Sequence, residues 1–541
     1  MANRPERSYD GVIIGAGHHG LVLGSYLAKS GLDILLLERR LDYGGGLTTK
    51  EVTLPGFYHN LHSINHFHIS EAPWFKDLGL SDRVGYVTPP YELGQAHSDG
   101  TCLVFGRNLE ETLKSVARFS KRDANTFREW NRKAEEITRQ IFLPERYSEP
   151  LPRERREALL SRTELGRDFL AVTRRQPLEV VNELFENERV KLLSLFKVSL
   201  FGTWLTDTLN AESPMGSVIR AFDLESGYQL CRGGSFNLAR GLMETFIAAG
   251  GRFAPQSQVS RIVLEGGRAT GVELADGRTI RARGFVASAI DVHQTFDDMI
   301  GREQLPAEFA AKLDRFKYTP WTLYGLHLAL NESPRFAAEK HDPNINRALK
   351  WNVGAETMSD LFSAHESVKR GEVPAIIQFG AGPLSLLDPL QAPAGKHTTY
   401  AWHVLPRRFE ADDRDHERFN REFAEQIIER WAHYCPNMTR KNILAQHVYT
   451  HREYAQELVN MRSGDIFMGA FSADQVMYNH FGYRTPVANL YMAGSPAHPG
   501  GAISGGAGYI AASLIARDLG VKLWWQPWDA GAALEAVKGT A

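Results

Sequence analysis

Three glycines near the start of the chain have the type and spacing needed to bind a phosphate group. Gly15, Gly17 and Gly20 form the pattern GxGxxG, and Glu38 stands 18 residues after the third glycine. Glycines in this pattern let the backbone approach a pyrophosphate at a helix N-terminus. An acidic side chain at this distance can accept hydrogen bonds from ribose hydroxyls. These residues therefore predict a dinucleotide site.

Such a site needs a strand, a helix and a second strand to position it. Val12 to Ile14 are apolar, and the glycines are followed by Leu21, Leu23, Tyr26 and Leu27 at helical spacing. Gly31 ends the predicted helix, and a second strand is expected at residues 33–37, directly before Glu38. The agreement of these elements predicts a βαβ unit and an α/β fold.

A second glycine-rich stretch, "AGSPAHPGGAISGGAG", lies near the other end of the sequence. A strand is expected at residues 489–493, and an apolar helix is expected from Ala502 or Ser504 onwards. A flexible linker would lack both elements. Small residues allow backbone contact with a planar ring, and a helix N-terminus stabilises negative charge at the ring edge. This stretch therefore predicts a wall that faces a flat ligand.

The sequence after the first βαβ unit resembles a known family. Glu38 is followed by two arginines, three spacer residues, the glycines Gly44 to Gly46 and then Pro-Gly-Phe. This arrangement, together with the closing glycine-rich stretch, is similar to the phytoene desaturase and carotenoid isomerase type of FAD flavoprotein, within the amine-oxidase-like superfamily. The branch named pyridine nucleotide-disulphide oxidoreductase domain proteins is especially similar. Many relatives carry an arginine directly after the Gly-Gly pair, where this chain has Gly46.

The resemblance implies FAD as the cofactor and a set of residues around it. Val259 would bond the adenine through its backbone, and Arg39 would lie on the phosphate or adenosine side, whereas Arg40 is expected on the surface. The residues expected at the cofactor are Gly15, Gly17, Gly20, Glu38, Arg39, Gly44, Gly45, Gly46, Leu47, Val259, Ser288, Gly494, Pro499, Gly500, Gly501, Ile503 and Ser504.

The resemblance also implies an interleaved two-domain architecture of the glutathione-reductase type. Residues 1–90, 231–300 and 480–520 would form a discontinuous, Rossmann-like FAD-binding domain. Residues 91–230 and 301–479 would form an α+β substrate domain, built from a helical insert and an antiparallel sheet. Residues 521–541 would form a Trp-rich C-terminal tail.

The predicted function is that of an FAD-dependent oxidoreductase for an apolar, isoprenoid or carotenoid-like substrate. Hydride would pass from carbon to flavin N5, in a desaturation or a flavin-assisted double-bond isomerisation. Because only one nucleotide-binding βαβ unit is present, oxygen or a quinone is the expected electron acceptor. Three alternatives stay open: a flavin amine oxidase, a non-redox isomerase or hydratase that uses reduced FAD, and a prenyl-binding module without enzyme activity.

Histidines supply the candidate catalytic groups. His498 stands in the closing glycine-rich stretch, and His59 and His62 follow the Gly-Gly segment, so each is expected beside the flavin. The four histidines of "YHNLHSINHFHIS" also raise the question of a metal. Their spacings of three, four and two fit neither one helix face nor one strand face, so no metal site is predicted.

Composition excludes several other classes. A formal charge of −2 gives no electrostatic basis for nucleic-acid binding. No secretory signal and no apolar run long enough to span a membrane are found, and the three cysteines are far apart. A cytoplasmic location is therefore expected. The tryptophans of "VKLWWQPW" indicate packing on their own domain, a subunit contact in a homo-oligomer, or peripheral membrane association.

Overall fold

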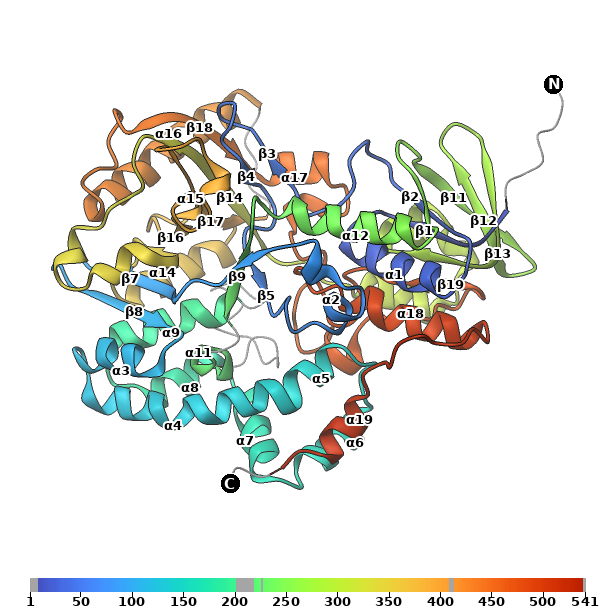
Figure 1. The fold of residues 1–541 in the computed structure, drawn as a ribbon, viewed down its shortest axis with the longest axis horizontal. Helices are drawn as coiled ribbons and strands as arrows, with labels where there is room; N and C mark the ends of the chain where they lie inside the picture. Colours follow the sequence, from blue (N-terminus) through green and yellow to red (C-terminus); the bar gives the residue numbers. More distant parts are fainter. Residues whose placement is uncertain (1–7, 201–217, 225–226, 408–412, 539–541) are drawn as a thin grey trace.

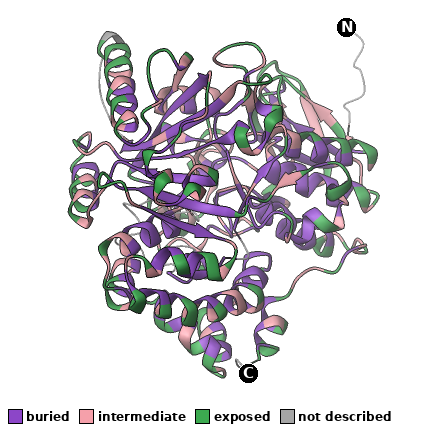
Figure 2. Cartoon of the chain, turned by 60° about the vertical axis from the view of Figure 1, so that its left-hand side comes forward, coloured by how far each residue is buried: buried purple, intermediate pink, exposed green. Residues whose placement is uncertain are grey.

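Two seven-stranded sheets organise the chain in a computed structural model, which describes residues 8–200, 218–224, 227–407 and 413–538. The first sheet lies to the right in Figure 1 and the second to the left, with a layer of helices below the second. The strands of both sheets are mostly buried, and the exposed residues are concentrated on the outer faces of the surrounding helices (Figure 2).

The first sheet joins segments from the beginning, the middle and the end of the sequence. Its order is β10-β2-β1-β13-β12-β11, and β19 pairs with β13. The pairs of β1 with β2 and with β13, and of β13 with β19, are parallel, which confirms the predicted βαβ start. Its strands are β1 Ser8–Ile14, β2 Ile34–Leu37, β10 Arg252–Ala254, β11 Val259–Glu265, β12 Arg268–Leu274, β13 Thr279–Ser288 and β19 Leu490–Met492.

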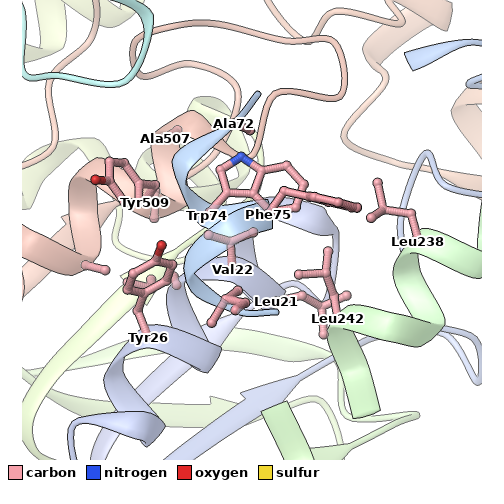
Figure 3. Packing of buried hydrophobic residues seen from close by; sticks show 14 of the residues in the cluster. Leu21, Val22, Tyr26, Ala72, Trp74, Phe75, Leu238, Leu242, Ala507 and Tyr509 are labelled. Atoms are coloured by element: carbon pink, nitrogen blue, oxygen red, sulfur yellow. The ribbon is translucent and has the colours of Figure 1, made fainter. Parts of the chain in front are cut away.

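Three helices, α1 (His18–Lys29), α12 (Phe236–Ala248) and α18 (Gly506–Asp518), pack beside this sheet. Figure 3 shows Trp74, from α2 (Pro73–Asp77), in the same cluster as residues of all three helices. The backbones of α1 and α18 approach closely, because a Cβ on Gly508 would lie 2.2 Å from the carbonyl oxygen of His19. Glycine is therefore required at that crossing.

The closing helix begins later than the sequence predicts. Ala502 and Gly505 both have a φ of +64°, which is the left-handed region and interrupts a right-handed helix. As a result α18 starts at Gly506, and the residues before it form an irregular turn that follows β19.

The second sheet has the order β18-β14-β17-β16-β15-β7-β8. The prediction of an antiparallel sheet is wrong at one pair, because β15 and β7 run parallel. A long stretch of chain separates these two strands, so no tight turn forces them to be antiparallel. The strands are β7 Tyr91–Ala96, β8 Cys102–Gly106, β14 Trp321–Leu330, β15 Ala348–Val353, β16 Phe379–Gly382, β17 His397–Pro406 and β18 Ile443–Tyr449.

Helices cover the second sheet and form the layer below it. The helical layer is α3 Leu109–Ala117, α4 Lys121–Ile137, α5 Leu143–Arg146, α6 Arg153–Leu160, α7 Glu164–Thr173, α8 Pro177–Leu184, α9 Glu188–Ser199 and α11 Ile219–Phe222. Other elements are β3 Thr49–Lys50, β4 His59–Asn60, β5 His66–Phe67, β6 Tyr86–Val87, β9 Tyr228–Cys231, α13 Ala307–Asp314, α14 Met358–Lys369, α15 Leu384–Leu387, α16 Asp413–Tyr434, α17 His451–Glu457 and α19 Ala530–Glu535.

The tryptophans of the tail pack on the protein's own first helix. The Trp524 ring stacks on Tyr26 with 5.1 Å between centroids, and Trp525 meets the same ring edge-on at 4.7 Å. The Lys29 Nζ lies 3.7 Å from the centre of the Trp524 ring. Of the three interpretations of this stretch, packing on its own domain is thus confirmed. Within the described ranges, no helix has both the length and the apolar character to cross a bilayer.

Candidate active site

Two adjoining cavities lie between the first sheet and the second. The outer cavity, of about 540 Å³, lies beyond the carboxyl ends of β1 and β2, and the inner cavity, of about 150 Å³, extends towards the second sheet. Both cavities are lined by Gly17, Gly45, Ala289, Leu458 and Asn460. The two cavities therefore adjoin each other and are treated together as one cleft, and the glycine-rich turn after β1 lines both parts of it.

Glu38 lies at the wall of the outer cavity, directly after β2. Its carboxylate accepts hydrogen bonds from the backbone N–H groups of Ala16, at 3.1 Å, and Arg40, at 3.0 Å. Val259, the first residue of β11, lines the same cavity. The arrangement places a carboxylate, the glycine-rich turn and a strand end around one space, as nucleotide binding requires.

The glycines of the turn leave room for a ligand beside the protein backbone. A Cβ on Gly17 would meet only the Cα of Gly45, at 4.0 Å, and would otherwise project into open space. Gly15 lines the outer cavity and has a φ of +98°, which favours glycine. Its carbonyl oxygen lies close to Gly20, because a Cβ added to Gly20 would be 2.1 Å from that oxygen. The first turn of α1 begins here, and its N–H groups have no partners within the helix. The turn thus fits a pyrophosphate.

Two arginines and a glutamate form the far wall of the outer cavity. Arg40 forms an ion pair of 3.1 Å with Glu457, at the end of α17, and its side chain is only 13% exposed. The expectation that Arg40 is a surface residue is therefore wrong, because this ion pair draws it inward. Arg39 is more exposed, and it donates a hydrogen bond of 2.9 Å to the Glu457 carbonyl. Lys50 pairs with the same carboxylate.

The closing glycine-rich turn contributes a smaller part of the wall than the sequence predicts. Ile503 lines the inner cavity, together with its neighbour Ala502. The other residues predicted in this turn are not among those that line either cavity: Gly494, Pro499, Gly500, Gly501 and Ser504.

Gly501 and Ser504 are held by close backbone contacts, and Pro499 and Gly500 line a separate small pocket, so contact of these residues with the cofactor stays a prediction. A Cβ on Gly501 would lie 2.3 Å from the Phe467 carbonyl oxygen, and the Trp74 indole N–H donates a hydrogen bond of 2.6 Å to the Ser504 carbonyl. These contacts fix the path of the turn, so glycine here serves close packing of the backbone.

Four other predicted residues also stand one layer back from the cleft. Gly20 packs on the carbonyl of Gly15, and the Gly44 N–H donates a hydrogen bond of 2.8 Å to the Ala16 carbonyl. Leu47 bonds back to Gly44 at 3.0 Å, and the Ser288 hydroxyl lies 2.6 Å from that of Thr295. Gly45 and Gly46, between them, do line the inner cavity.

The three candidate histidines occupy three different environments. His62 lines the inner cavity, and neither of its ring nitrogens has a hydrogen-bond partner among the described residues. His59 lies 2.8 Å from the Thr53 hydroxyl and packs edge-on against His327. His498 donates from Nε2 to the Glu145 carbonyl at 2.8 Å, and it lines a separate small pocket.

Burial keeps these rings neutral. It lowers the pKa of His59 and His62 to about 3 and that of His498 to about 4. Within the described chain, no group of three or more metal-ligating side chains could hold an ion. A catalytic role for any of the three histidines stays a prediction, and His62 is the one that reaches the cleft.

Most of the inner cavity is apolar, but several polar side chains also line it. Its apolar residues are Ile64, Phe67, Leu200, Leu323, Trp402, Leu458, Met461, Ile466, Phe467, Met468 and Ile503. The polar residues include His18, His19, Asn65, His66, Arg146 and Lys350. The sequence analysis considered only His66 among them, as one of the four histidines weighed for a metal site. His18 and His19 fill the variable positions of the GxGxxG pattern, which is the one signal that pointed to them. Arg146 and Lys350 come from α5 and β15, and no local pattern marks them.

Comparisons with known proteins agree with this geometry. Residues 13–78 match the family model described as NAD(P)-binding Rossmann-like domain. The chain is 31% identical to a limonene dehydrogenase subunit of Castellaniella defragrans, over 96% of both chains. It is 27% identical to pyridine nucleotide-disulfide oxidoreductase domain-containing protein 2 of Rattus norvegicus, covering 95% of this chain and 94% of the other.

More distant similarities extend over nearly the whole chain. Phytoene desaturase (lycopene-forming) of a Paracoccus species is 23% identical, with 94% of this chain and 97% of the relative covered. A solved oxidoreductase from Methanosarcina mazei superposes with a TM-score of 0.57 at 17% identity, over 93% of this chain and 99% of the other. At that identity the superposition shows a shared fold.

Proposed function

The chain belongs to the phytoene desaturase-like FAD oxidoreductases, and we propose that it oxidises, desaturates or isomerises the carbon framework of an apolar, terpenoid-like substrate. The observation that carries this proposal is that the two cavities share Gly17, Gly45 and Ala289 in their linings. A site suited to a dinucleotide therefore adjoins a space that is lined mainly by apolar side chains. The relatives named for limonene and phytoene support a terpenoid as the occupant.

The residues of the outer cavity fit the adenosine and pyrophosphate of FAD. Glu38 would hold the ribose, the N-terminus of α1 would hold the phosphates, and the start of β11 at Val259 would meet the adenine. Gly45, Gly46 and Ile503 would face the ring system in the inner cavity. We assign residues 1–90, 231–300 and 480–520 to this cofactor-binding part of the chain, and 91–230 and 301–479 to the substrate part.

When bound there, FAD supplies a hydride acceptor at its N5 position. The protein's contribution is alignment and exclusion of water. Trp402, Leu323 and Phe467 on the far wall would hold an apolar substrate against the cofactor face, which is the effect that accelerates a hydride transfer. His62, neutral and without a hydrogen-bond partner among the described residues, would offer a hydrogen bond in the same space.

Oxygen or a quinone is the proposed electron acceptor, because among the described residues a single parallel βαβ unit carries the dinucleotide pattern. The proposal does not require a membrane contact from the tail, since its tryptophans are engaged with Tyr26 and Lys29.

Anaerobic flavin bleaching tests the proposal. The purified protein is expected to be yellow, and its flavin absorbance should fall when a terpenoid or carotenoid is added without oxygen. Acyl chains and amines in the same panel should leave the absorbance unchanged. Bleaching by amines alone would establish the amine oxidase alternative, and a colourless protein that refuses added FAD would reject the enzyme assignment.

A further inference from the structure

Two buried cations face the inner cavity, and nothing in the proposed function so far uses them. Arg146, the last residue of α5, is 2% exposed, and Lys350, in the middle of β15, is 6% exposed. Both line the cavity. A hydrocarbon substrate would leave both of these basic groups without a partner at the site where it binds.

Arg146 is held by aromatic rings and lacks a full set of acceptors. Its guanidinium lies 4.9 Å from the centre of the Phe67 ring and 5.8 Å from that of Phe142. Its Nε and Nη1 atoms have no hydrogen-bond partner within the described ranges. A buried guanidinium whose donors are not satisfied is energetically unfavourable, and an anion in the cavity would satisfy them.

Lys350 is in a comparable position. Its Nζ lies 3.7 Å above the Tyr228 ring, and it forms no ion pair with any residue that the structure describes. The closest acidic influence on it is Glu92, which is already paired with Lys197 at 2.8 Å. Burial lowers the pKa of Lys350 to about 7, and an anion in the cavity would restore its proton.

The two cations stand on one continuous surface. Phe67 and Tyr228 are paired across strands β5 and β9, with 5.7 Å between ring centroids, so the side chains above them share a wall. Arg220 also lies over Phe67, but it is paired with Asp223 at 3.4 Å. The Asn65 amide and the His66 Nε2 add polar atoms without partners among the described residues, and both residues line the same cavity.

We propose that the substrate is an amphipathic acid, an apolar isoprenoid-like chain that carries one carboxylate, and that Arg146 and Lys350 bind this carboxylate. The inference rests on the proposed function and names the substrate class of the same cavity. A planar guanidinium matches a carboxylate in a bidentate pair, and the lysine adds a second charged donor. The apolar walls formed by Leu323, Trp402 and Phe467 exclude a small inorganic anion as the natural occupant, because they would remain uncovered.

The test compares three ligands on the FAD-loaded protein. Farnesoic acid, its methyl ester and farnesol share one chain and differ in the head group. Binding is measured by the shift of the flavin absorption spectrum without oxygen and by calorimetry, so it does not depend on turnover. The acid is expected to bind about tenfold to a hundredfold more tightly than the ester, as hydrogen bonds to charged groups predict.

Variants identify the groups responsible. Arg146→Gln and Lys350→Met are each expected to lower the ratio of acid affinity to ester affinity about tenfold. The affinity for farnesol should stay within about threefold of that of the unsubstituted protein. Arg146→Lys, which keeps the charge, should retain part of the preference. Arg153→Gln is the matched control, because this arginine is 61% exposed and points away from the cleft to Glu157.

The outcomes separate this inference from the proposed function. Equal affinity for acid and ester in the unsubstituted protein overturns the inference, whatever the variants do. If farnesol or the ester nevertheless bleaches the flavin, the proposed function stands. If the acid binds tightly through Arg146 and Lys350 but no ligand bleaches the flavin, the carboxylate site is supported and the proposed oxidation is rejected. Should a variant fail to fold, the comparison of acid with ester in the unsubstituted protein decides alone.

Discussion

The carboxylate of Glu38 accepts a hydrogen bond of 3.1 Å from the backbone N–H of Ala16, which ties the end of β2 to the glycine-rich turn after β1. The same side chain lines the outer cavity. One residue therefore holds the turn in shape and presents a negative charge to the space beside it.

Replacing Glu38 should weaken FAD binding. Glu38→Ala removes the acceptor that we assign to the ribose hydroxyls, and the FAD dissociation constant should rise about tenfold to a hundredfold. The flavin-to-protein ratio after gel filtration measures this. Glu273→Ala, on β12 and outside both cavities, should retain a full complement of flavin. Unchanged retention in Glu38→Ala would remove the ribose assignment.

Two glycines of the same turn should respond differently to alanine. Gly17 has a φ of −71°, and its Cβ would touch only Gly45, so Gly17→Ala should fold normally. The added methyl group would occupy the space where the phosphate approaches. The FAD dissociation constant should therefore rise at least about tenfold, which corresponds to about 1.4 kcal/mol of binding free energy.

Gly20→Ala is the structural counterpart. Its Cβ would lie 2.1 Å from the Gly15 carbonyl oxygen, so the free energy of unfolding should fall by about 1–3 kcal/mol. Chemical denaturation of the flavin-free proteins measures both variants. A Gly17→Ala protein that binds FAD normally would show that the phosphate does not approach this residue.

Lys350 should make stability depend on pH in a predictable direction. Its pKa is lowered from 10.5 to about 7 in the folded protein, so between these values the unfolded state binds more protons. The free energy of unfolding contributed by this group should therefore rise with pH from about 7 to 10.5. Lys350→Met should flatten the rise and stabilise the ligand-free protein at pH 7 by up to about 4 kcal/mol. A destabilised Lys350→Met protein would indicate that the charge has a partner.

Trp525→Ala should destabilise the protein without affecting any membrane contact. The side chain is buried and meets Tyr26 edge-on at 4.7 Å, so the loss should be about 3 kcal/mol. Thermal unfolding measures the change, and sedimentation with phospholipid vesicles provides the second readout. If Trp525→Ala binds vesicles less well than the unsubstituted protein does, the packing role is contradicted.

His498→Gln should leave the oxidation chemistry almost unchanged. A glutamine can still donate a hydrogen bond to the Glu145 carbonyl, and the histidine lines a pocket separate from the cleft. The rate of anaerobic flavin bleaching and its pH profile should match those of the unsubstituted protein within about threefold. The loss of one limb of the pH profile would instead assign His498 a proton-transfer role.

The βαβ unit was predictable because its determinants are local. The glycines, the apolar run of α1 and Glu38 lie within about thirty residues, and hydrophobic periodicity together with turn residues specifies each element. The start of α18 was not predictable in the same way, since the left-handed conformation of Ala502 depends on contacts made elsewhere in the fold.

The polar residues that line the inner cavity could not be predicted from the sequence for a different reason. Arg146 and Lys350 are single cations in segments that otherwise resemble an ordinary helix and a buried strand, and only tertiary packing brings them to one wall. Likewise, the sequence predicts Gly20 and Gly501 at the cofactor, and the structure shows that close backbone packing also requires glycine at both positions. Composition does not distinguish the two uses of glycine.

The parallel pair of β13 and β19 also completes the first sheet with residues that are far apart along the chain. At ordinary synthesis rates, the glycine-rich turn after β1 is made about half a minute to a minute and a half before Leu490 is added. The first βαβ unit must therefore wait for a strand made much later before its sheet is complete.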